Sequence, residues 1–362
     1  MPPAYDAVVI GAGFAGAATA YHLSRLGEFR ILILERETEP GRHASGKNAA
    51  LLRQAVNDAR VGAMVQETLR ALESPPEDWE RKNIFRRTGS VLLGENRVLR
   101  GFAGLLQKLG AAFELRGHED FPETLGAEFR AELRAADYEA LLFTPGDGVV
   151  DVAALLSNFL DAARSRGATL HCGAEVRGLS REAEGWRVTT GAAEFRARLV
   201  VNSAGPWAGG LGVAAGLPDR GFAHFRRHLF LAAAASPQPD RPYLWDTAHE
   251  FYFRPDPQGL LLCAGDEESH PAREPAVDPS VEPRLFAKLR AHFPALAPPA
   301  IRRAWACLRS FLPGSPFLIE AEAGAPGFLW VAGLGGHGMG SSFGAGRSAA
   351  ERAAAFLNRQ AP

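Results

Sequence analysis

The sequence predicts a mixed fold, in which an α/β domain with a parallel sheet is joined to an α+β domain with a mostly antiparallel sheet. A strand, a glycine turn, a helix and a second strand follow one another at the start of the chain. A strand that runs into a glycine-rich segment recurs near the C-terminus, which indicates that the α/β domain is discontinuous. Between them, residues 226–301 are rich in proline and strand-forming residues. A chain of 362 residues has room for about two domains.

The opening βαβ unit is defined by its apolar runs. Tyr5–Ile10 is a short strand-forming run, Ala17–Leu26 has the apolar spacing of a helix, and Ile31–Leu34 is a second apolar run. Continuous apolar strands are typical of a parallel sheet that is covered on both faces. We therefore expect these two strands at the centre of the α/β domain.

The turn between the first strand and the helix has the pattern Gly11-x-Gly13-x-x-Gly16. The first glycine allows the tight bend, the second lets the backbone approach a pyrophosphate, and the third allows close helix packing. Glu35 follows the second strand, about 20 residues after the turn, where an acidic side chain hydrogen-bonds ribose hydroxyl groups. Together these features predict a Rossmann-like domain that binds a dinucleotide.

Shorter elements follow along the rest of the chain. We expect further strands at residues 90–93, 169–170, 186–188, 198–202, 251–253, 260–262 and 328–332, and helices at residues 126–134, 152–160 and from 346 onward. We therefore assign residues 1–82, 144–225 and 302–362 to the dinucleotide-binding domain, and residues 83–143 and 226–301 to the substrate-binding domain.

Composition and charge exclude several classes of partner. Forty basic residues against 41 acidic ones give a net charge of −1, so there is no basic excess for a nucleic acid backbone. Cys172, Cys263 and Cys307 lie far apart, with neither metal-ligand nor disulfide-framework spacing, and we predict no metal site. The N-terminus lacks a basic leader, and the apolar runs are shorter than a membrane helix needs. We expect a cytoplasmic protein without a transmembrane segment, with peripheral membrane association left open.

Several further segments identify a family resemblance. The loop Pro40–Ala50 is small and polar, where a simple NAD domain would proceed to another helix. The chain resembles the D-amino-acid oxidase superfamily of FAD-dependent flavoproteins, which includes glycine and sarcosine oxidases, and within it the D-arginine dehydrogenase branch. The segments that carry the resemblance are the first βαβ unit, residues 35–36 with the loop, and residues 201–207, 251–252, 305–311 and 328–340. Residues 90–140 match poorly.

The resemblance implies FAD, with its adenine end at the first βαβ unit and its flavin under the C-terminal glycines. The cofactor-binding residues that it implies are Gly11, Gly13, Phe14, Ala15, Gly16, Glu35, Arg36, Ala44, Ser45, Gly46, Lys47, Asn48, Ala49, Ala50, Leu51, Val176, Ala204, Gly205, Trp207, Gly335, Gly336, His337, Gly338 and Met339. Cys307 aligns with the cysteine that carries covalent FAD in sarcosine oxidases, and a small buried thiol is the alternative interpretation. We expect non-covalent FAD, and a covalent link at Cys307 stays open.

The substrate site needs an arginine that can hold a carboxylate, because the flavin carries out the redox chemistry and the protein orients the substrate. Arg309 and Arg227 fall where the resembled branch has such arginines, and Tyr252 matches a tyrosine of the same site. The alternatives are a solvated charge for either arginine, a role for the adjacent Arg226, and core packing for Tyr252. His337 is interpreted either as a proton shuttle or as a polar residue beside the flavin.

The sequence also departs from the resembled branch at three positions. Gly89 stands in place of the glutamate that holds a guanidinium tail, and Leu51 and Val56 replace a histidine and a tyrosine. We therefore expect a neutral or apolar D-amino acid and not D-arginine.

These residues predict a flavoenzyme that oxidises the Cα–N bond of a D-amino acid to an imino acid, by hydride transfer to flavin N5. Carboxylate anchoring serves other substrates equally, so oxidation of a 2-hydroxy acid or of a sarcosine-like N-methyl amino acid is the alternative activity. A flavoprotein-fold binding module or a subunit of a larger complex is the non-enzymatic alternative. Either oxygen or a quinone could reoxidise the flavin.

Overall fold

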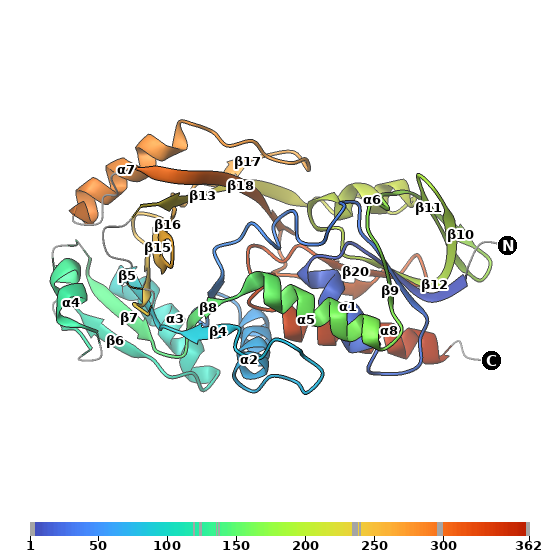
Figure 1. Ribbon diagram of the computed structural model, residues 1–362, viewed down its shortest axis with the longest axis horizontal. Helices are drawn as coiled ribbons and strands as arrows, with labels where there is room; N and C mark the ends of the chain where they lie inside the picture. The colour runs from blue at the N-terminus through green and yellow to red at the C-terminus, as the bar shows by residue number, and fades with distance from the viewer. Residues whose placement is uncertain are drawn as a thin grey trace.

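The structure is a computed structural model that describes residues 4–118, 120–122, 125–134, 136, 138–233, 238, 240–294 and 300–359. The molecule is elongated, and both ends of the described chain lie at one end of its long axis (Figure 1). Within the described residues, an eight-stranded sheet occupies that end and a nine-stranded sheet extends toward the other. The predicted combination of a parallel α/β sheet with a mostly antiparallel sheet is confirmed.

The eight-stranded sheet assembles strands from the start, the middle and the end of the chain. Its strands are β1 (Ala4–Ile10), β2 (Ile31–Leu34), β9 (Thr169–His171), β10 (Val176–Glu182), β11 (Gly185–Thr190), β12 (Glu194–Asn202), β19 (Leu318–Ala321) and β20 (Phe328–Ala332). β1 pairs in parallel with β12 and β2, while β2 pairs with β9 and β12 with β20. The carboxyl ends of β1, β2, β12 and β20 therefore share one edge, which is where ligands of such sheets bind.

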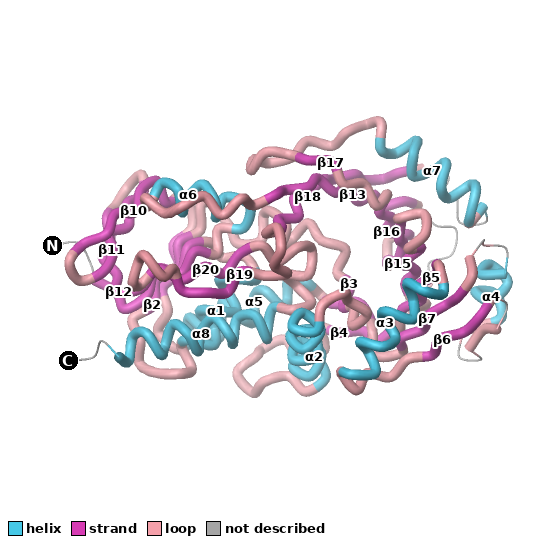
Figure 2. Tube along the Cα trace, turned by 180° about the vertical axis from the view of Figure 1, so that it is seen from behind, coloured by secondary structure: helices cyan, strands magenta, loops and turns pink. Residues whose placement is uncertain are grey.

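Both faces of this sheet are covered, as the continuous apolar strands predict. Val9 and Ile33 belong to the core under the helices, whereas Val8 and Leu32 belong to the core on the opposite face. One face carries α1 (Phe14–Leu23), α5 (Val152–Ser165) and α8 (Ser342–Arg359), with α2 (Ala59–Glu73) next to α8. The other face carries the turn η1 (Gly205–Trp207) and α6 (Ala208–Ala214) (Figures 1 and 2).

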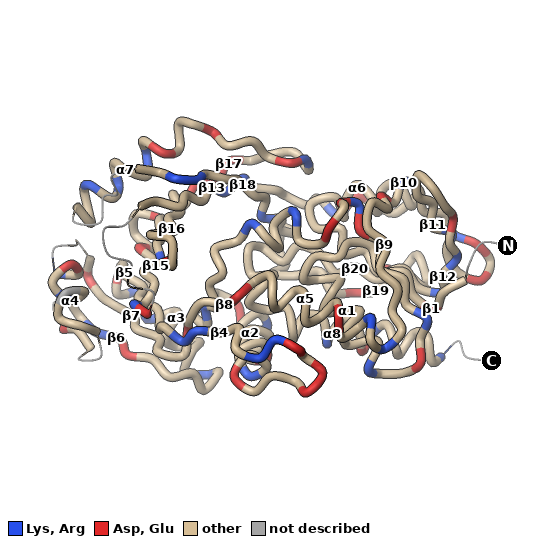
Figure 3. Tube along the Cα trace, viewed as in Figure 1, with Lys and Arg blue, Asp and Glu red and all other residues tan. Residues whose placement is uncertain are grey.

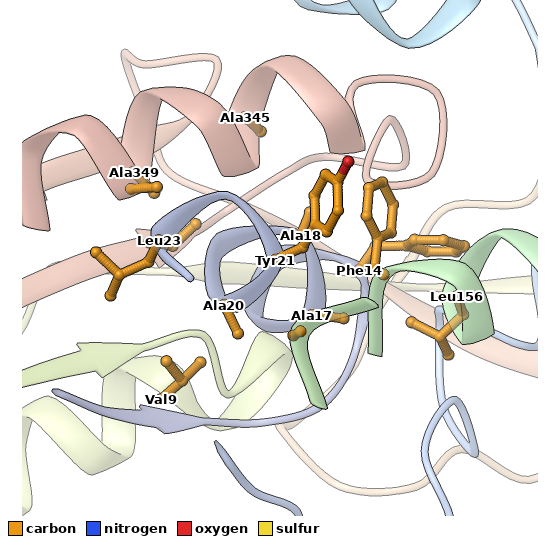
Figure 4. Packing of buried hydrophobic residues seen from close by; sticks show 14 of the residues in the cluster. Val9, Phe14, Ala17, Ala18, Ala20, Tyr21, Leu23, Leu156, Ala345 and Ala349 are labelled. Carbon is orange, nitrogen blue, oxygen red and sulfur yellow. The ribbon is translucent and has the colours of Figure 1, made fainter. Parts of the chain in front are cut away.

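Small residues bring α1 and α8 into close contact. Ala18 of α1 faces the segment of α8 that contains Ala345 and Ala349, and Val9 of β1 lies beneath α1 (Figure 4). A Cβ atom added to Gly346 would lie 2.5 Å from the Cβ atom of Ala18. The contact therefore requires a residue without a side chain, and it ties the C-terminal helix to the first helix of the chain.

The nine-stranded sheet contains the proline-rich segment. Its strands are β5 (Ser90–Gly94), β6 (Glu114–Gly117), β7 (Ala140–Thr144), β13 (Ala223–Ala232), β14 (Tyr243–Asp246), β15 (Phe251–Asp256), β16 (Gly259–Cys263), β17 (Glu268–Ser269) and β18 (Ile301–Phe311). All pairs are antiparallel except β14 with β5. The strands expected at residues 251–253 and 260–262 form a hairpin, because Phe253 of β15 lies opposite Leu262 of β16. The helices α3 (Asn96–Lys108), α4 (Ala127–Arg134) and α7 (Val281–His292) accompany this sheet (Figure 2).

A smaller sheet made of β3 (Leu51–Leu52), β8 (Gly148–Val150) and β4 (Phe85–Arg87) completes the described strands. None of the described helices combines the length and the apolar character that crossing a membrane requires. Basic and acidic residues are interspersed over both ends of the molecule (Figure 3). The domain boundaries at residues 82, 143, 225 and 301 stay a prediction.

Some elements differ from the expected ones in extent. α1 begins at Phe14 and ends at Leu23, and α8 begins at Ser342, several residues before the position expected from the sequence. The region from 226 to 301 also contains α7, whose Val281, Leu285 and Leu289 are buried at helical spacing. The proline content of this region disfavours a helix, but Pro283 lies in the first turn of α7, where a missing N–H group is tolerated.

Gly346→Ala tests the contact between α1 and α8. The added methyl group would overlap Ala18, so we expect the free energy of unfolding to fall by about 1–3 kcal/mol in urea denaturation. Gly101→Ala in α3 is the control, because a Cβ atom there meets nothing and alanine favours a helix by about 0.5–1 kcal/mol. Equal stability of Gly346→Ala and the unaltered protein would contradict the packing described here.

Candidate active site

A cavity of about 640 Å³ lies at the shared strand edge of the eight-stranded sheet and reaches residues of the nine-stranded sheet. This volume lies within the range of cofactor and ligand pockets. One end is lined by the turn after β1, by Glu35 and by Trp207. The other end is lined by residues of β13, β14, β15 and β18 together with the turn after β20.

The glycine turn at the first end has no room for side chains. Gly11 has φ +95°, and a Cβ atom on it would lie 2.6 Å from the carbonyl oxygen of Ser203. A Cβ atom on Gly16 would lie 1.9 Å from the carbonyl oxygen of Gly11. The Ser45 hydroxyl accepts a hydrogen bond from the amide of Phe14 at 3.0 Å, at the N-terminus of α1. Bare backbone and a helix N-terminus thus face the cavity, as a pyrophosphate requires.

Glu35 is fixed by the backbone at the end of β2. Its side-chain oxygens accept hydrogen bonds from the amides of Ala12 at 2.9 Å and Glu37 at 3.0 Å. The guanidinium carbon of Arg36 lies 4.4 Å from the ring centre of Trp207, and both residues line the cavity together with Val176. This end of the cavity therefore presents a fixed carboxylate beside a flat aromatic wall.

The loop from Ala44 to Leu51 is organised by one amide side chain. Asn48 donates hydrogen bonds to the carbonyl oxygens of Ser45 at 2.7 Å and Ala44 at 3.4 Å. It also accepts one from the amide of Ala50, which has φ +62°, at 2.8 Å. This bond offsets part of the cost of a left-handed alanine, and the loop follows the cavity wall.

The turn after β20 closes over the other end of the cavity. Gly335 and Gly336 have φ values of +47° and +81°, and a Cβ atom on Gly336 would lie 2.9 Å from Cδ of Arg309. The amide of Gly335 donates to the carbonyl oxygen of Ser310 at 2.9 Å. The turn therefore packs directly on β18 beside Arg309, and this approach requires glycine.

His337, at the end of this turn, is held in one tautomer. Nδ1 lies 3.1 Å from the carbonyl oxygen of Gly335, and Nε2 lies 3.3 Å from Nη2 of Arg53. Since a carbonyl can only accept and a guanidinium can only donate, Nδ1 carries the proton and Nε2 accepts. Burial, reinforced by the charge of Arg53, lowers the pKa of His337 to about 3. A neutral imidazole with both nitrogens engaged is a positioning group and a poor proton shuttle.

Arg53 is the residue that the sequence analysis missed. Its guanidinium lies 4.0 Å from the ring centre of Trp245 and lines the cavity next to His337. Burial lowers its pKa below the usual range, Tyr243 and the carboxylate of Asp147 partly oppose this shift, and no described carboxylate lies within ion-pair distance of it. In the sequence, Arg53 is marked only as a charged residue that follows two leucines, at the end of the loop expected to lie along the cofactor. A sheltered guanidinium with no carboxylate within ion-pair distance can take such a partner from a ligand.

The buried carboxylate of Asp147 binds the residue that follows Arg53. Asp147 accepts hydrogen bonds from the amide and the side chain of Gln54, from the Ser90 hydroxyl and from the Tyr243 hydroxyl. Burial raises its pKa to about 6, although the bonds from Ser90, Gln54 and Tyr243 oppose the shift. Asp147 thereby fixes the backbone immediately after Arg53.

Arg309 and Arg227 lie side by side on β18 and β13 and share one carboxylate. Nη2 of Arg227 donates to Oε1 of Glu267 at 2.8 Å, and Nη2 of Arg309 donates to the same oxygen. The Arg227 side chain is 6% exposed and that of Arg309 is 18% exposed, so neither is a freely solvated surface charge. The adjacent Arg226 pairs instead with Glu268 and Asp278, outside the cavity lining.

Tyr252 and Cys307 form the apolar wall beside these arginines. Tyr252 packs on Trp245 with ring centres 4.8 Å apart, and burial raises its pKa well above the usual range. Cys307 lines the same cavity, and burial raises the pKa of its thiol to about 12. A thiol that stays protonated is a weak nucleophile, so the chemistry of this site disfavours a covalent attachment.

Not every predicted residue reaches the cavity. Val56 is buried in the core under the helices, and Gly89 packs against Phe143, so neither lines the cavity wall, whereas Leu51 does. Gly46 packs on the backbone of Gly41, and the Lys47 side chain binds Glu274 at 2.7 Å. The other residues predicted to bind the cofactor line the cavity, except Gly16, which packs on the glycine turn.

The lining of the cavity fits an extended dinucleotide. The bare glycine turn suits a pyrophosphate, and the carboxylate of Glu35 suits ribose hydroxyl groups. The turn at Gly335–Gly336 packs on β18 and forms one wall of the other end of the cavity. Among the described residues, no group of three or more His, Cys, Asp or Glu side chains is placed to hold a metal ion.

The low pKa of His337 makes folding sensitive to acid. The unfolded chain takes up a proton at this residue below its ordinary value of 6.5, whereas the folded protein does so only near pH 3. Protonation therefore favours unfolding, and the stability that neutral His337 contributes is lost as the pH falls from 6.5 toward 3. We expect His337→Gln to make the fall in stability between pH 6.5 and 5 shallower, by at most about 1.4 kcal/mol per pH unit.

Urea denaturation of the flavin-loaded protein at several pH values measures this slope. His171→Gln is the control, because His171 is exposed on β9 and lies outside the cavity. Parallel stability curves for His337→Gln and the unaltered protein would show that His337 is not held neutral by its surroundings.

Comparison with sequences of known proteins finds relatives over most of the chain. The mouse pyruvate dehydrogenase phosphatase regulatory subunit is 24% identical over 97% of this chain, and human peroxisomal sarcosine oxidase is 26% identical over 92%. The alignment covers 88% of the human sarcosine oxidase but only 41% of the mouse regulatory subunit. Human dimethylglycine dehydrogenase is 27% identical over 71% of this chain, and that alignment covers 30% of the human protein. The chain thus spans less than half the length of the first curated relatives that it matches.

Solved structures share the fold. L-proline dehydrogenase from P. horikoshii has a TM-score of 0.84 at 20% identity, covering 97% of this chain and 93% of that one. Glycine oxidase from Geobacillus kaustophilus has a TM-score of 0.81 at 21% identity, covering 99% and 96%.

A family model fits residues 6–352, nearly the whole chain. This match confirms the resemblance to the D-amino-acid oxidase superfamily and FAD as the cofactor, whereas the D-arginine dehydrogenase branch stays a prediction. The chain belongs to the DAO family of FAD dependent oxidoreductases.

Proposed function

We propose that this chain oxidises the Cα–N bond of an amino acid or N-methyl amino acid and that Arg53 binds the substrate carboxylate. The observation that carries the proposal is the sheltered guanidinium of Arg53, which faces the cavity and has no carboxylate partner among the described residues. Arg guanidinium groups bind carboxylates through two parallel hydrogen bonds, which fixes orientation as well as position. Arg309, Arg227 and Tyr252 remain the proposed contacts at the same end of the cavity.

The protein's part in this reaction is to bind and orient. FAD, when bound, supplies the acceptor for the two electrons and the hydrogen taken from the substrate. Trp245 and Tyr252 exclude water from one side of the site, and His337 holds Arg53 without carrying a charge of its own. The imino acid product then reacts with water to give a 2-oxo acid and ammonia, or a primary amine when the substrate is N-methylated.

The names of several relatives support a substrate that is an amine with a carboxylate. Human sarcosine dehydrogenase is 27% identical over 75% of this chain, and the peroxisomal sarcosine oxidase and dimethylglycine dehydrogenase described above are similar. Non-covalent FAD is part of the proposal, because the Cys307 thiol is held protonated. The D-configuration is also part of it, carried over from the family resemblance.

The prediction against D-arginine gains support from charge. Arg53, Arg227 and Arg309 line this end of the cavity and share only the carboxylate of Glu267 at ion-pair distance, so a cationic side chain would meet net positive charge. The prediction of a neutral or apolar side chain rested partly on Val56 and Gly89, which do not line the cavity.

A binding subunit without catalysis is the second candidate. It is favoured by one observation, namely that the relative matched over 97% of this chain is named a regulatory subunit. The two candidates differ in whether an amine reduces the flavin.

Anaerobic titration of the purified flavoprotein with D- and L-amino acids, sarcosine and 2-hydroxy acids tests the proposed function. We expect an amine that carries a carboxylate to bleach the visible flavin band, with D-arginine inactive. Arg53→Met should raise the half-saturating concentration of that amine about 10- to 100-fold, since a hydrogen bond to a charged group contributes about 1.5–3 kcal/mol. Arg303→Met is the matched control, because Arg303 is exposed and stacks on Trp305 outside the cavity.

Bleaching by 2-hydroxy acids alone would replace the amine by an alcohol as the substrate. A yellow protein that no compound reduces would favour the binding subunit. An unchanged response in Arg53→Met would remove the assigned role of Arg53.

A further inference from the structure

Asp147 is linked to the residues on both sides of Arg53. Its Oδ1 atom accepts hydrogen bonds from the amide of Gln54 at 3.0 Å and from the Gln54 side chain at 2.9 Å. The Tyr243 hydroxyl lies 3.0 Å from Oδ2 of Asp147 and 3.2 Å from the carbonyl oxygen of Leu52. The backbone that carries Arg53 is therefore held at two points around one buried carboxylate.

The charges of Asp147 and Arg53 act on each other without a direct bond. The side chains that bind Asp147 in the described structure are neutral donors, namely those of Gln54, Ser90 and Tyr243. Burial lowers the pKa of Arg53, and the charges of Tyr243 and Asp147 oppose this shift. Two buried charges of opposite sign stabilise each other, since either one alone would be costly in a poorly hydrated site.

A ligand in the cavity meets only one member of this pair. Arg53 lines the cavity, whereas Asp147 is fully buried and lies outside the cavity lining. A carboxylate bound to Arg53 from the cavity therefore adds a second negative charge near Asp147 but does not touch it. Like charges in a site of low dielectric constant repel each other, and protonation of one of them relieves the repulsion.

We propose that Asp147 is a positioning residue that sets the affinity of Arg53 for the substrate carboxylate, and that it takes up a proton when this carboxylate binds. The inference rests on the proposed function, because it takes Arg53 as the substrate anchor. Before binding, the carboxylate of Asp147 balances the charge of Arg53. After binding, the ligand carboxylate takes over this role and Asp147 becomes neutral.

Asp147 is suited to this exchange near neutral pH. Burial raises its pKa to about 6, against the opposing hydrogen bonds from Ser90, Gln54 and Tyr243. A nearby ligand carboxylate raises this pKa further, because it disfavours the ionised form. Between pH 6 and 8 the free protein therefore holds Asp147 largely ionised, and the complex holds more of it protonated.

The other groups around this pair keep their charge in the same range of pH. Arg53 and Arg309 stay positive, since guanidinium groups are not deprotonated in proteins. Burial raises the pKa of Tyr243 on β14 and of Tyr252 on β15 well above the usual range, and it lowers the pKa of His337 to about 3. β5 and α2 contribute the neutral side chains of Ser90 and Gln66 to this region.

Propionate binding to the flavin-loaded protein tests the proposal. The shift of the visible flavin spectrum gives the dissociation constant, and calorimetry in buffers of different ionisation enthalpy gives the number of protons taken up. Propionate itself stays ionised between pH 6 and 8. We expect binding to be about 2- to 10-fold weaker at pH 8 than at pH 6, with uptake of a fraction of a proton near pH 7.

Asp147→Asn removes the charge and keeps the size of the side chain. We expect this variant to bind propionate about 3- to 30-fold more tightly than the unaltered protein at pH 8, without dependence on pH and without proton uptake. A residue that only supported the backbone would weaken binding when altered. Asp151→Asn is the matched control, because Asp151 is exposed at the start of α5, where asparagine caps a helix equally well.

Ser90→Ala tests the same carboxylate if Asp147→Asn does not fold. The Ser90 hydroxyl donates to Oδ2 of Asp147 at 2.6 Å and favours its ionised form. Loss of this bond should raise the pKa of Asp147, so the fall in propionate affinity should move to higher pH. An unchanged pH profile in Ser90→Ala would contradict the assignment of the titration to Asp147.

The outcomes separate this inference from the proposed function. Propionate binding that is independent of pH and takes up no proton would overturn the role of Asp147, as would equal or weaker binding by Asp147→Asn at pH 8. Either result leaves Arg53 as the anchor if Arg53→Met still loses propionate. Unchanged propionate binding by Arg53→Met, together with no bleaching by amines, would overturn the proposed function itself.

Discussion

The sheltered positive charge of Arg53 is the constraint on which the rest of the site depends. A guanidinium removed from water without an anionic partner is costly unless other groups compensate it. Trp245 stacks on it, His337 accepts a hydrogen bond from it, and Asp147 fixes the neighbouring backbone of Gln54. These contacts hold the charge in place at the wall of the cavity. The neutral state of His337 follows from the same charge and from its own burial.

The fold supplies this site by joining segments that are far apart in the chain. The glycine turn after β1, the loop from Ala44 to Leu51 and the turn after β20 line one cavity, because their strands share an edge of one sheet. The close contact of α1 with α8 through Gly346 fixes the first and last of these segments relative to each other. The nine-stranded sheet contributes the arginines of β13 and β18 and the aromatic wall of β14 and β15. The end of the cavity near Arg309 thus combines residues of the nine-stranded sheet with Arg53, which follows β3, and with the turn after β20.

Local patterns in the sequence were sufficient for the nucleotide end of the site. The spacing of Gly11, Gly13 and Gly16 reports a requirement of the backbone, and Glu35 follows directly from the end of its strand. The substrate end could be predicted only in part. Arg309 and Arg227 were found through the family resemblance, but their shared partner Glu267 depends on the pairing of β13 with β18, which no local pattern encodes.

Substrate-pocket residues that were carried over from the resembled branch by position did not all reach the cavity. Val56 was expected to line the substrate pocket but belongs to the core under the helices, because the chain turns inward toward α2 after Arg53. Arg53 itself, three positions earlier, was not identified, since a charged residue after a loop has no distinctive local signature. Its significance comes from its burial beside the cavity without a carboxylate at ion-pair distance among the described residues, which is a property of the folded chain.

A crystal structure of the flavin-loaded protein with bound propionate would test the central claim most directly. We predict that the carboxylate of propionate lies within hydrogen-bond distance of the Arg53 guanidinium, which stays stacked on Trp245. A carboxylate bound elsewhere in the cavity, or an Arg53 side chain paired with a carboxylate of the protein, would contradict the assignment of Arg53 as the substrate anchor.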